Sequence, residues 1–114
     1  MPPIDREEAE RILASEASSE RVSETLIRIA LHDSDWRWVQ TFCLEFLSIS
    51  DDLAIQSAAI ISLGHLARIH RILNLDLVLP ALSFLLDDEM LSGKVSDALD
   101  DIRMFVEEAE KHDK

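Results

Sequence analysis

The sequence between residues 36 and 106 repeats one pattern twice, and this repeat constrains the fold more than any other feature. Each copy, residues 36–69 and 77–106, has an apolar helical segment, a short acidic break and a second apolar helical segment. Apolar positions of the two copies align at an offset of roughly 38 residues: Leu44, Phe46 and Leu47 with Leu82, Phe84 and Leu85. A period of about 40 residues with two helices per unit is typical of helical solenoids. Such stacks provide surfaces that bind other macromolecules.

Apolar residues at helical spacing predict six helices. They are expected near residues 5–14, 20–31, 36–47, 53–69, 77–86 and 93–110, with a frayed tail at 111–114. The serine-rich break at residues 15–19 contains neither Gly nor Pro, so one long bent helix over residues 5–32 stays open beside two helices. The segment 53–69 is apolar nearly all round, which predicts a central helix covered on several sides.

Acidic residues stand at the start of three of these helices. The segments 32–35 and 50–52 are expected to cap the third and fourth helices, and Asp76 the fifth, because serine and aspartate side chains accept the first free backbone N–H groups. Pro80 is expected in the first turn of the fifth helix, where its missing donor is least costly.

Composition supports one all-α domain over residues 1–114. The chain is 47% hydrophobic, with only two glycines and three prolines, which leaves little turn chemistry for β-hairpins. Its single cysteine, Cys43, cannot form an internal disulfide. No apolar run approaches the roughly 20 residues that span a bilayer. These features predict a soluble cytoplasmic protein without membrane association.

The formal net charge of −12 restricts the classes of partner. Nucleic-acid binding requires a positive surface, so the charge argues against a nucleic-acid partner. A basic protein partner fits, since complementary charge accelerates encounter. The acids also fit a simpler role, which is to keep a small helical protein in solution.

The residues Asp51–Gln56, followed by Ala59, Leu63 and Gly64, resemble the second half of a HEAT repeat. The sequence departs from that family at Gln56, where an arginine that ties successive repeats to an aspartate is usual. The resemblance implies a HEAT-like α-solenoid of about three antiparallel helix pairs. Residues 64–71, taken with 35–40, are also similar to small stand-alone HEAT-repeat proteins of bacteria. Some of these resemble immunity proteins of polymorphic or contact-dependent toxin systems, which implies a protein that neutralises a toxin.

The sequence contains no catalytic, metal or cofactor signature. Cys43 falls on the apolar stripe of its helix, with no activating base among its neighbours, and is expected to be a buried small hydrophobe. The four histidines lack the spacing of metal ligands. We therefore expect no enzymatic activity, no metal and no cofactor.

Four residues are the candidates for partner binding. Asp97, Asp100 and Asp101 cluster on one side of the last helix, where they form either a solvated acidic face or a docking site for a basic partner. The local sequence indicates no basic partner for them. Trp38 lies about 200° around its helix from Trp36, so both cannot share the core face. Trp38 is expected either to pack on a neighbouring helix or to anchor an interface, a role in which tryptophan is enriched.

The function predicted from these features is a non-enzymatic protein-binding module. Its most specific form is an immunity-type protein that occludes a basic toxin domain with its acidic helical surface. The alternative is a general HEAT-repeat adaptor that joins cellular proteins. A monomer or a weak homodimer is expected, because a helical stack exposes apolar ends.

Overall fold

The computed structural model describes residues 1–108, and this part of the chain is all-helical and without strands. The elements are α1 (Arg6–Ala14), α2 (Ser19–His32), α3 (Trp36–Ile49), α4 (Leu53–His70), α5 (Leu75–Ser83) and α6 (Ser92–Ile102), followed by a π-helical turn, η1 (Arg103–Glu107). The all-α prediction with six α-helices is confirmed over these residues. Residues 109 and 110 of the predicted last helix, and the predicted frayed tail at 111–114, lie outside the described residues.

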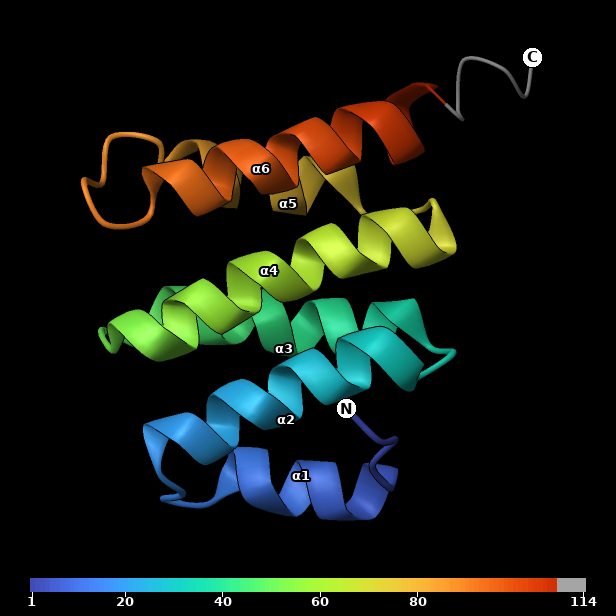
Figure 1. The fold of residues 1–114 in the computed structure, drawn as a ribbon, viewed down its shortest axis with the longest axis vertical. Helices are drawn as coiled ribbons and strands as arrows, with labels where there is room; N and C mark the ends of the chain where they lie inside the picture. The colour runs from blue at the N-terminus through green and yellow to red at the C-terminus, as the bar shows by residue number, and fades with distance from the viewer. Residues whose placement is uncertain (109–114) are drawn as a thin grey trace.

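The helices stack in pairs along the chain (Figure 1). Short connections join α1 to α2, α3 to α4 and α5 to α6, so the members of each pair run antiparallel. Helices α2, α4 and α6 lie side by side in one layer, while α3 and α5 lie behind them and contact each other. The stack measures 43 × 32 × 22 Å. This solenoid-like arrangement places the even-numbered helices on one continuous face.

Serine and aspartate caps separate the helices. Ser18 accepts a hydrogen bond from the backbone N–H of Arg21, which fixes the start of α2 and makes residues 5–32 two helices. Asp35 and Asp52, which lie within the two predicted capping segments, accept backbone N–H groups at the starts of α3 and α4. These caps satisfy donors that the helices cannot pair internally.

The core is organised around α4. Its buried residues lie on several sides of the helix, and α4 contacts α2, α3, α6 and η1. Ile60, Leu63 and Leu66 are fully buried. The prediction of a central helix that is covered nearly all round is therefore confirmed. The predicted burial of Cys43 is confirmed as well, since its exposed fraction is 0%.

The fifth helix differs from its prediction. It begins at Leu75 and ends at Ser83, with Asn74 at the N-cap position and no side-chain cap bond. Asp76 therefore lies in the first turn and is not the cap, and Pro80 lies inside the helix. Because proline has no backbone N–H, α5 lacks the helical hydrogen bond from residue 80 to the carbonyl of Asp76. Phe84 follows the helix end and is 86% exposed, whereas its aligned counterpart Phe46 packs against the core.

Candidate functional site

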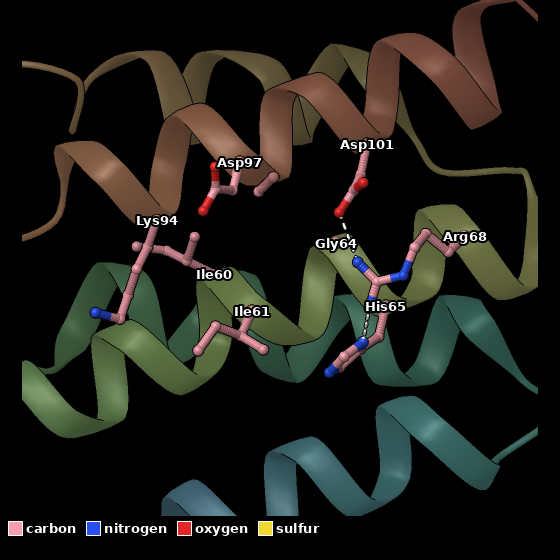
Figure 2. Close-up of a pocket in the computed structure, with 9 residues that line it drawn as sticks. Ile60, Ile61, Gly64, His65, Arg68, Lys94, Asp97 and Asp101 are labelled. Atoms are coloured by element: carbon pink, nitrogen blue, oxygen red, sulfur yellow. Dashed lines mark hydrogen bonds and ion pairs between the residues drawn. The ribbon is translucent and has the colours of Figure 1, made fainter.

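A cleft between α4 and α6 brings two basic and two acidic side chains together (Figure 2). Its volume is about 420 Å³. We call it the α4–α6 cleft, and its lining residues are Ile60, Ile61, Gly64, His65 and Arg68 from α4, and Lys94, Asp97, Ala98 and Asp101 from α6.

Small residues allow α4 and α6 to approach each other at the floor of this cleft. Gly64 and Ala98 are both buried. A Cβ atom on Gly64 would lie 3.3 Å from Oδ2 of Asp101 and 3.8 Å from Cα of Ala98. The absence of a side chain at Gly64 therefore leaves room for the Asp101 carboxylate.

One end of the cleft is closed by an ion pair. Nη1 of Arg68 lies 2.6 Å from Oδ2 of Asp101, and this contact joins α4 to α6. The Arg68 guanidinium also contacts Nδ1 of His65. A guanidinium has no acceptor, so it donates and His65 accepts. Burial, followed by the charge of Arg68, lowers the pKa of His65, while Asp101 opposes the shift. His65 is thus held in the neutral form that accepts this hydrogen bond.

The other end of the cleft holds two charged groups without a short contact. Asp97 points from α6 toward α4 (Figure 2) and is exposed. Among residues 1–108, neither Asp97 nor Lys94 forms a salt bridge or a side-chain hydrogen bond. The carboxylate of Asp97 thus retains its full capacity to accept hydrogen bonds from a partner.

The structure separates the four predicted partner-binding residues. Asp97 and Asp101 line the cleft together. Asp100 lies on α6 outside the cleft lining, with Oδ1 3.5 Å from Nη2 of Arg103. Trp38 is not part of the cleft lining, and it contacts Glu10 of α1, the helix at the opposite end of the stack from α6 (Figure 1).

Trp38 is half-buried against other parts of this chain. Its Nε1 donates a hydrogen bond of 3.2 Å to Glu10, and the Arg6 guanidinium lies 4.7 Å from the centre of its ring. Its ring also meets that of Phe42 edge to face. Arg6 in turn donates two hydrogen bonds, of 2.7 and 3.1 Å, to Asp33. Trp38 therefore packs on a neighbouring helix, and its role as an interface anchor stays a prediction.

Sequence reasoning missed the basic groups beside the acidic cluster. The expectation that the local sequence holds no basic partner for these aspartates is wrong, since Lys94 lines the same cleft. Arg68, from another helix, pairs with Asp101. Lys94 lies one helical turn before Asp97, so the sequence alone could have predicted that the two side chains share a face of the helix. Arg68 is 33 residues from Asp101, and only the alignment of successive helix pairs brings them together.

The described residues contain no group of three or more His, Cys, Asp or Glu side chains placed to hold a metal ion. Burial raises the pKa of the Cys43 thiol to about 12, which keeps it protonated and unreactive near neutral pH. Within residues 1–108, no helix has both the length and the apolar character needed to cross a membrane.

The fold and the cleft define an all-α stack of helix pairs with a charged groove on one face.

No protein-family model and no curated protein matches the sequence. Among solved structures, the chain is similar to one in the crystal structure of a CDI complex (contact-dependent inhibition) from Cupriavidus taiwanensis LMG 19424. The TM-score is 0.80 and the sequence identity is 28%, over 91% of this chain and 90% of that chain.

Proposed function

We propose that this chain is a non-enzymatic immunity-type protein that binds and occludes the toxin domain of a contact-dependent inhibition system. The observation that carries the proposal is the similarity to a chain of the Cupriavidus complex, which extends over nine-tenths of both chains. At 28% identity this likeness includes sequence as well as fold. Contact-dependent systems pair a toxin with an immunity protein, and the resemblance found in residues 64–71 and 35–40 points to the immunity side.

Charge supports this assignment. The whole chain carries −12, and residues 87–108 contain eight acids against two bases. A protein that blocks a basic surface, such as that of a nucleic-acid-cleaving toxin, gains both encounter rate and specificity from this complementarity. Asp97, Asp100 and Asp101 are the proposed contacts, and Trp38 is a second, separate candidate anchor. In this proposal the chain acts in the cytoplasm, as a monomer or weak homodimer, by covering the toxin surface.

The test is a titration of the purified chain with the purified toxin domain encoded beside its gene. We expect a one-to-one complex with a Kd in the nanomolar range or below, as for protein inhibitors with standard-sized interfaces. Affinity should fall as salt is raised, because exposed charges are screened beyond about 8 Å at physiological ionic strength. A gene neighbourhood without a toxin, or a toxin domain that does not bind, would contradict the proposal and favour the general adaptor.

A further inference from the structure

The α4–α6 cleft combines an apolar floor with a charged edge. Ile60, Gly64 and Ala98 are buried at its floor, and Ile61 is 36% exposed at its rim. A long basic side chain fits such a surface, because its methylene stem covers apolar atoms while its charged head stays near the edge. The cleft volume of about 420 Å³ is ample for one side chain of this length.

The two carboxylates of the cleft are not equivalent. Asp101 is already paired with Arg68 at 2.6 Å. Asp97 lies four residues earlier on the same face of α6 and has no ion-pair or hydrogen-bond partner among the described residues. A charged head that enters the cleft therefore finds its free acceptor at Asp97, with the neutralised Arg68–Asp101 pair beside it.

The charges that line the cleft balance, because Arg68 and Lys94 oppose Asp97 and Asp101, so the preference for a cation comes from the acidic segment around the cleft. Arg68 is engaged by both Asp101 and His65, so it offers little to an incoming anion. Lys94 lies at the opposite end of the cleft from Arg68, with Asp97 between them along α6 (Figure 2). The surrounding segment, residues 87–108, is strongly acidic. The favoured position for a guest cation is thus between Asp97 and Asp101.

We propose that the α4–α6 cleft receives one lysine or arginine side chain of the partner protein, whose stem lies on Ile60, Ile61 and Ala98 and whose head pairs with Asp97. The inference rests on the proposed function, since the partner protein is the toxin domain and the inference specifies which kind of toxin side chain enters the α4–α6 cleft. Asp101 acts here as a positioning residue: with Arg68 it holds α6 against α4 and shapes the cleft wall.

The test compares Asp97→Asn with Asp100→Asn in titrations against the toxin domain encoded beside the gene, at about 0.15 M salt. Both variants remove one carboxylate from α6, but only Asp97 lines the cleft. We expect Asp97→Asn to weaken binding by about tenfold or more, as for a charge pair desolvated in an interface. Asp100 is also a proposed contact, but it is exposed to solvent outside the cleft. Asp100→Asn should therefore weaken binding by a smaller factor, less than about threefold. Circular dichroism of both variants checks that each is folded.

Lys94→Ala provides a second, opposite readout. Removing this cation from the cleft rim should tighten binding, because it no longer repels the guest cation. If the wild-type chain binds the toxin domain while the two aspartate variants weaken binding equally, or Lys94→Ala weakens it, the cleft proposal is overturned and the proposed function stands. If the wild-type chain does not bind, the proposed function itself fails.

Discussion

At the scale of single residues, the contact between Arg6 and Asp33 shows how one charge joins distant parts of the chain. Arg6 in α1 donates to Asp33, which lies just after α2, and stacks on Trp38 in α3. The hydrogen bonds from Arg6 lower the pKa of Asp33, against a smaller opposing effect of burial. The ionised form of Asp33 therefore stabilises the folded state.

This shift predicts a pH dependence of stability. A carboxyl whose pKa is lower in the folded state contributes stability above its unfolded pKa, here 3.8, and loses it as the pH falls through the folded value. In urea unfolding, wild type should be more stable than Asp33→Asn at pH 7, and the difference should shrink steadily below about pH 4.

Arg6→Ala is the matched variant for this prediction, because it removes the main cause of the shift. When Arg6 is absent, the loss of stability caused by Asp33→Asn should therefore lose most of its dependence on pH. If that loss stays constant from pH 7 down to about pH 3 while Arg6 is present, Asp33 is not stabilised in its ionised form.

At the scale of the elements, the contact between α4 and α6 depends on small residues where the helices meet. Glycine at position 64 is about 1 kcal/mol less favourable in a helix than alanine. Because it has no side chain, α6 can lie close enough to α4 for Asp101 to contact Arg68. Gly93, in the first turn of α6, has no atom within 4 Å of the position that a Cβ would occupy. The two glycines therefore form a natural pair for comparison.

Substitutions at these glycines should separate packing from propensity. Gly64→Ala should change the free energy of unfolding by less than about 1 kcal/mol, because its gain in propensity is offset by displacement of the Asp101 carboxylate. Gly64→Leu should destabilise by about 2–3 kcal/mol through overpacking. Gly93→Leu should be neutral or stabilising by up to about 1 kcal/mol. Equal effects of leucine at both positions, measured by urea unfolding, would refute a close contact at Gly64.

The elements also show what the sequence could predict and what it could not. The apolar periodicity and the aspartates before α3 and α4 are local signals, and they located these helices closely. The fifth helix begins two residues and ends three residues before its predicted bounds, because Asp76 and Pro80 looked like start signals whereas the helix begins at Leu75, after Asn74. Phe84 falls just after the end of α5 and is exposed, whereas its aligned counterpart Phe46 lies inside α3.

For the site, the sequence supplied the acidic members and missed their neighbours. Asp97 and Asp101 share a helix face by simple spacing, so their grouping was readable. The sequence did not show that only Asp101 has an ion-pair partner. That difference depends on Arg68, which comes from α4, and on the room that Gly64 leaves for the carboxylate. Which residues of α4 and α6 meet depends on how far one helix is displaced along the other. A weak repeat pattern in one sequence does not specify this displacement to a single residue.

At the scale of the whole molecule, the acids of α6 and the charged α4–α6 cleft lie toward one end of the stack, whereas α1, which Trp38 contacts through Glu10, lies at the other end (Figure 1). A partner that covers the cleft would meet α6, which lies within a segment, residues 87–108, of eight acids against two bases. An excess of acids around the cleft suits the proposed inhibitor of a basic domain. Long-range attraction would guide the encounter, and short contacts would then determine specificity.

The most direct test of the central claim is the growth of bacteria in which the neighbouring toxin domain is induced with or without this chain. If the chain is the immunity protein, its co-expression should restore growth to the rate of uninduced cells, while an unrelated acidic helical protein at the same level should not. If cells that contain the folded chain stop growing as quickly as cells without it, the chain does not neutralise that toxin and the account is wrong.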